Sequence, residues 1–292
     1  MLADSTHVIV PMFTPASTVA AIVEHAVSDA LLVPTMIQML VDAPEAREAD
    51  LSGFRRVIYG ASPITEGVLG RARALLPGAA FTQLYGMTEL SPSATMLLPA
   101  DHDDPFVARS AGRAGVQVDV RIVDLDGTEL PRGEVGEVIV QGENVMHGYW
   151  NKPAETAAAL REGWMHTGDL AYMDDRGYVY IVDRLKDMII TGGENVYSTE
   201  VENALAKHPG VASCAVIAVP DPQWGERVHA VIVPRPDVRL TLDELQAFCR
   251  DYIAGYKVPR SVEIVDALPV SGAGKILKRE LRKAVRNAAE HA

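Results

Sequence analysis

The sequence predicts an α/β protein in which a partial sheet-and-helix large domain with a small β subdomain precedes an α+β C-terminal domain. Helical patterns alternate with short apolar runs in the first hundred residues, which is typical of a parallel α/β sheet. The pattern then changes to β alternation and turn signals. We therefore expect a large domain at residues 1–184, divided into an α/β part at 1–109 and a β part at 110–183, and a C-terminal domain at 185–292.

Composition narrows the class of protein. Of the 292 residues, 48% are hydrophobic and 23% charged, which is the balance of a soluble globular protein. The formal net charge of -12 argues against a nucleic-acid partner. Glu24 and Asp29 interrupt the apolar stretch 20–41, so no transmembrane segment is predicted. Cys214 and Cys249 lie in apolar contexts that favour buried free thiols, and a cytoplasmic location is expected.

In the α/β part, two apolar runs read as buried strands, Phe54–Gly60 and Ala80–Tyr85, and each ends at a glycine-containing turn. A further strand is predicted at His7–Val10. In parallel sheets ligands collect at the carboxyl ends of the strands. We therefore expect the turns after residues 60 and 85 to converge on one crevice. Incomplete cover of this sheet would leave an exposed edge, so a homo-oligomer is possible.

The β part and the C-terminal domain are predicted from alternation, turns and helix caps. The β part contains a segment at 116–123 in which apolar and polar residues alternate, and turn signals at Asp126-Gly127 and 175–177. Two capping boxes, Thr199 to Glu202 and Thr241 to Glu244, predict helices. The remaining predicted elements are strands at 135–140, 178–182, 215–219, 230–233 and 262–265 and a charged amphipathic helix at 278–292.

The turn that follows the second buried strand contains side chains that could bind a ligand. Tyr85-Gly86-Met87-Thr88-Glu89 offers an aromatic face, a hydroxyl and a carboxylate within five residues. These groups suit base stacking, a phosphate contact and a divalent cation. The structural alternative is a half-buried Tyr85 and a Glu89 that begins a helix. Gly60-Ala61-Ser62 has a glycine where the backbone can approach a ligand closely, which alone is a weak signal.

Asp169 and Arg184 lie fifteen residues apart, and a hairpin of that length can bring both to one ligand. An ionised carboxylate is a two-oxygen acceptor suited to two neighbouring ribose hydroxyls, although a turn-capping role is the alternative for Asp169. Gly192-Gly193 supplies bare backbone past which a narrow thiol-bearing arm could lie, and a simple turn is the alternative.

Three cationic side chains of the C-terminal domain are further candidate binding residues. Lys275 lies in a Gly-rich loop, and a P-loop is excluded because Pro269 and Ile276 stand where Gly and Ser or Thr are required. Lys257 and Arg260 follow the aromatic ring of Tyr256, an arrangement that suits a nucleotide phosphate and base, with a solvated turn as the alternative. The histidines have no zinc-ligand spacing, and no Gly-x-Ser-x-Gly motif of α/β-hydrolases occurs.

Together, the stretch 166–202, the Tyr85 to Glu89 motif and Gly274-Lys275 resemble the adenylate-forming superfamily of acyl-CoA synthetases, luciferases and peptide-synthetase adenylation domains. The resemblance runs almost end to end and implies a role for each motif. It implies that Gly60, Ala61 and Ser62 contact the adenine edge, that Tyr85, in the motif with Gly86, stacks on adenine, and that Thr88 contacts the α-phosphate. It also implies that Glu89 binds Mg²⁺, that Asp169 and Arg184 hold the ribose, that Lys186 is the hinge of the C-terminal domain and that Lys275 is the catalytic lysine. From the residues themselves, Gly192, Gly193, Lys257 and Arg260 are expected to contact CoA.

By this resemblance the expected function is acyl-CoA synthesis from a carboxylic acid, ATP and CoA with Mg²⁺. The runs 143–151 and 188–195 are most similar to medium- or long-chain fatty-acyl and aryl-CoA ligases. The superfamily's Ser/Thr/Gly-rich segment ending in Pro-Lys-Gly is not found before Tyr85. The chain is therefore expected to be the C-terminal part of a larger enzyme, with a catalytically incomplete nucleotide-binding or interaction fragment as the alternative. An adenylation domain that feeds a carrier protein is disfavoured.

Overall fold

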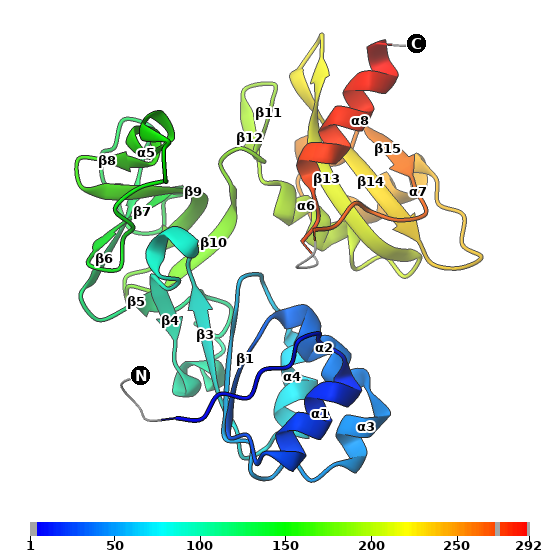
Figure 1. Ribbon diagram of the computed structural model, residues 1–292. Coiled ribbons are helices and arrows are strands. Elements are labelled where there is room, and N and C mark those ends of the chain that lie inside the picture. Colours follow the sequence, from blue (N-terminus) through cyan, green and yellow to red (C-terminus); the bar gives the residue numbers. More distant parts are fainter. Residues whose placement is uncertain (1–4, 272–274, 291–292) are drawn as a thin grey trace. The chain divides into compact units, whose positions relative to one another are not determined.

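The computed structural model describes residues 5–271 and 275–290, and the chain divides into two compact units (Figure 1). The first unit contains the chain up to Thr167 together with Tyr172–Ile181. The second contains Gly168–Ala171 together with the chain from Val182 onward. Each unit has its own hydrophobic core.

A five-stranded mixed sheet begins the first unit, in the order β1-β2-β3-β4-β5. Its strands are β1 (Asp29–Leu32), β2 (Arg56–Gly60), β3 (Ala80–Tyr85), β4 (Thr95–Leu97) and β5 (Arg113–Ala114). The pairs β1/β2 and β2/β3 are parallel, whereas β4 is antiparallel to both of its neighbours. Since Gly60 pairs with Leu84, β2 and β3 end at the same edge of the sheet. This confirms that the turns after these strands lie together.

Four helices pack on this sheet: α1 (Pro15–Glu24), α2 (Pro34–Asp42), α3 (Pro44–Glu48) and α4 (Glu66–Leu75). The first three begin with proline, whose constrained φ suits the first helical turn and whose missing N–H costs nothing there. Their apolar faces and the sheet enclose one core around Phe54, Tyr59 and Leu40. Figure 1 shows these helices gathered beside β1.

A β subdomain follows, with a sheet of order β10-β9-β7-β6 to which β8 adds by pairing with β9. Its elements are β6 (Val118–Val123), β7 (Gly136–Gly142), α5 (Pro153–Ala159), β8 (Leu160–Arg161), β9 (Trp164–Met173) and β10 (Val179–Arg184). The pairs β6/β7 and β8/β9 are antiparallel. Two short 3-10 turns, η1 (Thr88–Leu90) and η2 (Pro99–Asp103), precede the subdomain.

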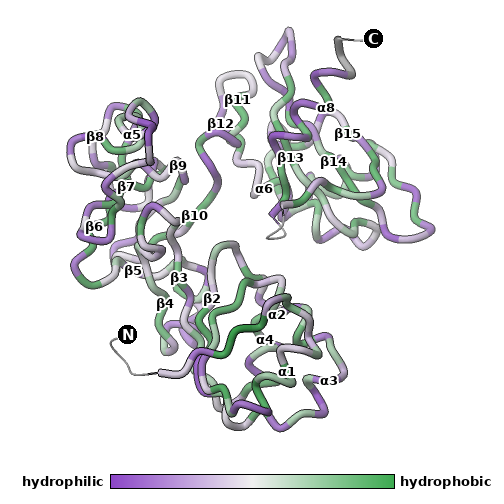
Figure 2. Tube along the Cα trace, in the orientation of Figure 1, coloured by the Kyte–Doolittle hydropathy of each residue, from purple (hydrophilic) through white to green (hydrophobic). Residues whose placement is uncertain are grey.

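The second unit is built on a third sheet of order β12-β11-β14-β13, and β15 pairs in parallel with β14. Its elements are β11 (Ile189–Thr191), β12 (Glu194–Val196), α6 (Ser198–Leu205), β13 (Val211–Asp221), β14 (Gly225–Pro234), α7 (Leu242–Cys249), η3 (Gly255–Lys257), β15 (Ser261–Ile264) and α8 (Lys278–Glu290). The long hairpin of β13 and β14 is hydrophobic in its central part (Figure 2) and contributes to the core of this unit, including Ile232.

The structure confirms most of the elements expected from the sequence, and two expectations are wrong. His7–Val10 is not a strand: this segment has no regular structure, and Ile9 is 79% exposed. The capping box at Thr199 does not form, because α6 begins at Ser198 and Glu202 accepts a hydrogen bond from the Val216 amide instead.

Other expectations of the sequence hold. The capping box at Thr241 is present, with Glu244 bonded back to the Thr241 amide. Cys214 and Cys249 are buried and free, and burial raises the pKa of Cys214 to about 12. Within 5–271 and 275–290, no helix is long and apolar enough to cross a membrane.

Candidate active site

The turn after β2 presents main-chain atoms at the sheet edge. A Cβ on Gly60 would lie 2.2 Å from the carbonyl oxygen of Leu84, so only glycine fits between these two strands. Ala61 follows with φ +69°, a left-handed conformation that is uncommon for a residue with a side chain. Ala61 is exposed and Ser62 half-buried, so the polar backbone of this turn is accessible to a ligand.

The turn after β3 lies beside it and is rigid. A Cβ on Gly86 would lie 2.2 Å from the carbonyl oxygen of Pro92, which shows how closely the chain folds back after Tyr85. Residues 88–90 then form η1, in which Leu90 is completely buried. Because Leu90 anchors the turn, the exposed Thr88 and the half-buried Glu89 are held at its surface.

A segment of the β subdomain holds this turn. The Asn144 amide group donates to the carbonyls of Leu90 and Ser93 at 3.1 and 2.9 Å. The Tyr149 hydroxyl donates to Oε1 of Glu89 at 2.8 Å. Sequence reasoning missed the roles of Asn144 and Tyr149, although both lie in the run 143–151 that carried the family resemblance.

The side chains present fit a magnesium ion that arrives with a nucleotide. Over the described ranges there is no group of three or more His, Cys, Asp or Glu residues that could hold a metal ion alone. Mg²⁺ commonly takes one or two carboxylates and completes its shell with phosphate oxygens and water. Glu89, beside the hydroxyl of Thr88, supplies such a carboxylate.

Asp169 and Arg184 lie together in the second unit, as the spacing of the hairpin predicts. Arg184 Nε is 3.1 Å from Oδ1 of Asp169. Asp169 is 8% exposed, whereas the Arg184 side chain is 53% exposed. Gly168, at φ +69°, accepts a hydrogen bond from the Leu185 amide at 2.8 Å and so joins the two strands at this point. The Arg184 guanidinium thereby orients the Asp169 carboxylate. The contact of this carboxylate with ribose stays a prediction.

The predicted hinge residue, Lys186, is an exposed member of the turn that follows β10. Its carbonyl accepts a hydrogen bond from Arg282 of α8 at 3.3 Å, and the same guanidinium pairs with the buried Asp187 carboxylate. On the other side of the turn, Asp183 accepts hydrogen bonds from the amide and the hydroxyl of Ser198 in α6. The turn is therefore fastened to two helices of the second unit.

The glycine pair expected beside the CoA arm packs against an aromatic residue. Gly192 and Gly193 have φ +62° and +85°, and the Gly192 amide donates to the Trp224 carbonyl at 2.9 Å. A Cβ on Gly192 would lie 3.0 Å from the indole of Trp224. The Arg260 guanidinium is 4.2 Å from the centre of the same ring. The structure thus joins Gly192 and Arg260 through Trp224, which sequence reasoning missed.

Lys257 differs from Arg260. Its Nζ donates to both carboxylate oxygens of Glu200, at 2.8 and 2.7 Å, and its side chain is only 18% exposed. This partly buried ion pair is first of all a structural contact between α6 and the segment before β15.

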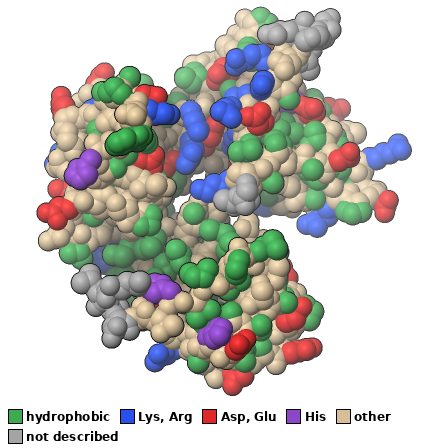
Figure 3. Space-filling view, viewed as in Figure 1, with side chains coloured by type: hydrophobic (Ala, Val, Ile, Leu, Met, Phe, Trp, Pro, Cys, Tyr) green, Lys and Arg blue, Asp and Glu red, His purple; other side chains and the backbone are tan. Residues whose placement is uncertain are grey.

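Lys275 is exposed on a narrow hairpin. Its carbonyl accepts from the Ser271 amide at 2.8 Å, and Val270 and Ile276 form a β-bridge. Gly274 lies outside the described residues. Because α8 begins at Lys278, the predicted catalytic lysine directly precedes this helix. Lys and Arg side chains gather over α8 in the space-filling view (Figure 3).

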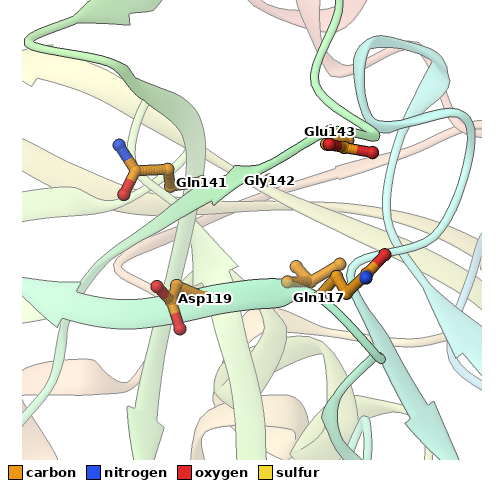
Figure 4. Close-up of a pocket in the computed structure, with 6 residues that line it drawn as sticks. Gln117, Asp119, Gln141, Gly142 and Glu143 are labelled. Carbon is orange, nitrogen blue, oxygen red and sulfur yellow. The ribbon is translucent and has the colours of Figure 1, made fainter.

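A surface hollow of about 510 Å³ lies elsewhere in the first unit (Figure 4). It is lined by Asp119 of β6, by Gln141 of β7 and by Gln117 and Glu143 next to these strands, among others, and it is wide open to solvent. None of the predicted site residues lines it. The candidate site residues are therefore the sheet edge of the first unit and, separately, the Asp169–Arg184 pair of the second unit, and this hollow is not among them.

These features define an α/β protein with a β subdomain and a C-terminal α+β unit. Residues 1–150 match the model of the family described as AMP-binding enzyme, and residues 200–275 match that of the AMP-binding enzyme C-terminal domain. The chain belongs to the AMP-binding enzyme family, within the adenylate-forming superfamily.

Relatives agree with this assignment. The chain is 47% identical to a feruloyl-CoA synthase of Amycolatopsis over 97% of its own length and 57% of that protein. It is 40% identical to the medium/long-chain-fatty-acid–CoA ligase FadD8 of Mycobacterium tuberculosis, over 94% and 49% of the two chains. The crystal structure of ATP-bound MatB from Rhodopseudomonas palustris superposes with a TM-score of 0.85 at 33% identity, over 96% and 55%. The chain spans about half the length of the relatives it matches.

Proposed function

We propose that the chain takes part in the ATP-dependent activation of a carboxylic acid and its transfer to CoA. In the first step a carboxylate oxygen attacks the α-phosphorus of ATP, the bond to the β-phosphate breaks, and acyl-AMP and pyrophosphate form. In the second step the CoA thiol loses its proton and attacks the acyl carbonyl, so that a C–S bond forms and AMP leaves. The domain boundaries at residues 184 and 185 and the hinge at Lys186 belong to this proposal.

The observation that carries the proposal is the Asp169–Arg184 pair. A nearly buried carboxylate held at 3.1 Å from a half-exposed guanidinium keeps its acceptor oxygens oriented. Vicinal ribose hydroxyls match such an acceptor. An adenylate would thus be held throughout both steps, whichever acid or thiol takes part.

The sheet edge supplies the other contacts in this proposal. The main chain of Gly60, Ala61 and Ser62 would meet the adenine edge, and Tyr85, placed by the tight bend at Gly86, would stack on the base. Thr88 would donate to the α-phosphate, and Glu89 would hold Mg²⁺. The metal ion supplies charge neutralisation for the phosphate oxygens.

In the second unit, Lys275 would place a positive charge against the charge that builds up as the carboxylate attacks the phosphate. Gly192 and Gly193 would border the pantetheine arm, because no Cβ narrows the passage there. Arg260 and Trp224 would receive the nucleotide of CoA, while the Glu200 pairing leaves Lys257 a weaker candidate.

The acid is proposed to be a medium- or long-chain fatty acid or an aryl acid. Support comes from the names of the relatives, which include both a feruloyl-CoA synthase and a fatty-acid–CoA ligase. A cell interior that supplies ATP and CoA is the expected setting.

Binding of an adenylate tests the nucleotide part of the proposal. The 292-residue protein is titrated calorimetrically with AMP and with an acyl-sulfamoyladenosine, a stable mimic of acyl-AMP. Asp169→Asn keeps the shape but removes the charge, and it should weaken both ligands about tenfold or more. Asp175→Asn, in an exposed turn, is the matched control and should bind like the wild type. Equal affinity of the two variants would contradict the ribose assignment.

Turnover tests the catalytic part. An enzyme in which this chain follows the superfamily's Ser/Thr/Gly-rich segment is incubated with ATP, Mg²⁺, CoA and either ferulate or a C8 to C16 fatty acid, and acyl-CoA and AMP are measured by mass spectrometry. Formation of both products in equal amounts is expected. Binding of the acyl-adenylate mimic without any product would contradict the catalytic part and leave the binding part standing.

A further inference from the structure

We propose that Tyr149 is a positioning residue for the metal site: its hydroxyl holds Oε1 of Glu89, so that Oε2 is directed to Mg²⁺ when the nucleotide binds. The inference rests on the proposed function, because it concerns the same carboxylate. It adds a residue to which the sequence motifs assigned no role.

The backbone of Glu89 is already held by the segment that carries Tyr149. The Met146 amide donates to the Glu89 carbonyl at 2.8 Å. Asn144 binds the carbonyls of Leu90 and Ser93, as described above. Three hydrogen bonds therefore join the turn to residues 144–146. With the backbone held in this way, the Glu89 side chain can still change its rotamer.

Tyr149 is itself restrained, as a positioning residue must be. Its amide donates to Oγ1 of Thr156 at 2.9 Å, and Thr156 in turn donates to the Lys152 carbonyl at 2.8 Å. Gly148, at φ +150°, has its α-carbon so close to Thr156 that a Cβ would lie 2.8 Å from the Thr156 methyl group. The phenol is thus directed to Glu89 by the start of α5 and by a conformation that glycine allows.

The chemistry of the contact suits a metal ligand. A carboxylate has two oxygens with about four acceptor positions, and the phenol occupies one. Over the parts of the chain that the structure covers, Tyr149 is the one side chain that donates a hydrogen bond to this carboxylate. The phenol hydroxyl lies 2.8 Å from Oε1 and is the donor of this hydrogen bond. Partners of this kind orient metal ligands, and their loss commonly weakens metal affinity 10- to 100-fold.

The test is Mn²⁺ binding, with Mn²⁺ as a paramagnetic substitute for Mg²⁺. The 292-residue protein is saturated with the non-reactive analogue α,β-methylene-ATP, and free Mn²⁺ is followed by electron paramagnetic resonance. Tyr149→Phe should weaken Mn²⁺ about tenfold and leave the affinity for the analogue without metal unchanged. Tyr252→Phe, an exposed tyrosine of the second unit, is the control for loss of a hydroxyl. In a Glu89→Gln background, Tyr149→Phe should have no further effect.

Different outcomes separate this inference from the function on which it rests. Unchanged Mn²⁺ affinity in Tyr149→Phe would overturn the inference alone, and so would an equal loss of analogue affinity without metal, which would indicate a general structural role. If the wild type binds no Mn²⁺ above what the analogue carries in solution, the metal assignment of Glu89 fails and the inference with it, while the Asp169 titration is unaffected.

Discussion

At the scale of single residues, two side chains of the proposed site are held by partners elsewhere in the chain. Glu89 is bonded to Tyr149, and Asp169 to Arg184. The partner in each case removes rotamers that a free side chain would sample, and so prepares the group for its ligand.

Lys275→Ala should separate the two half-reactions. The proposed charge acts only while the carboxylate attacks the phosphate, so acid-dependent ATP–pyrophosphate exchange should fall about a hundredfold. Thioester formation from preformed acyl-AMP should be nearly unchanged. Lys283→Ala, which removes an exposed charge from α8, is the control and should alter neither rate. Equal losses in both assays for Lys275→Ala would contradict its assignment to the first step.

His102 should make the first unit less stable in mild acid. Its ring nitrogens lie 2.9 Å from the Tyr59 hydroxyl and 2.8 Å from the Leu98 carbonyl, so the buried neutral ring is fully bonded. Burial lowers the pKa of His102 below 6.5. As the pH falls below about 6.5, His102 takes up a proton in the unfolded chain before it does so in the folded protein. The free energy of unfolding therefore decreases as the pH falls below this value.

The measurement is the free energy of unfolding in urea between pH 7.5 and 5.5. The wild type should lose about 1 kcal/mol more over this interval than His102→Gln, because the variant has no proton to take up. His7→Gln, at an exposed position, should follow the wild type. Parallel curves for wild type and His102→Gln would show that this ring does not contribute.

At the scale of elements, α8 contacts the turn that contains the predicted hinge residue Lys186, through Arg282. Arg282→Ala would leave the buried Asp187 carboxylate without its cation, which should lower stability by about 2–4 kcal/mol and expose the turn at Lys186 to proteases. Arg279→Ala is a matched control on the same helix, because Arg279 is 91% exposed and pairs only with Glu280. Its effect should stay within about 0.5 kcal/mol. Similar digestion of the two variants would contradict the fastening role of Arg282.

Elements with strong local signals could be predicted from the sequence. Ala80–Tyr85 is a strand with the expected limits, since an apolar run ended by glycine leaves little choice. His7–Val10 shows the same apolar character but has no neighbour to bond with, and strand formation depends on that neighbour. Thr199 failed as a cap because Glu202 is drawn to the Val216 amide and to Lys278, contacts that no local pattern reveals.

The same distinction applies to the candidate site. The motif residues Thr88, Glu89 and Asp169 were predicted because their chemistry is visible in a few adjacent letters. Tyr149 and Trp224 were missed because each reaches the site across dozens of residues, and only the folded chain brings them there.

At the scale of the whole molecule, two units with separate cores should unfold separately. Phe54 and Ile232 are each no more than 1% exposed and belong to different cores. Phe54→Ala and Ile232→Ala should each cost about 3–5 kcal/mol, and each should lower only one of two calorimetric transitions. A single transition that both variants lower equally would show that the chain melts as one cooperative unit.

The fastening of α8 also limits how freely Lys275 can travel. Only two residues, Ile276 and Leu277, separate this lysine from the helix, and the Leu277 amide is bonded to the Pro269 carbonyl at 2.8 Å. Lys275 is therefore connected by a short segment to α8, and Arg282 of this helix contacts the turn at Lys186. If that turn rotates as proposed, α8 and Lys275 should move with it.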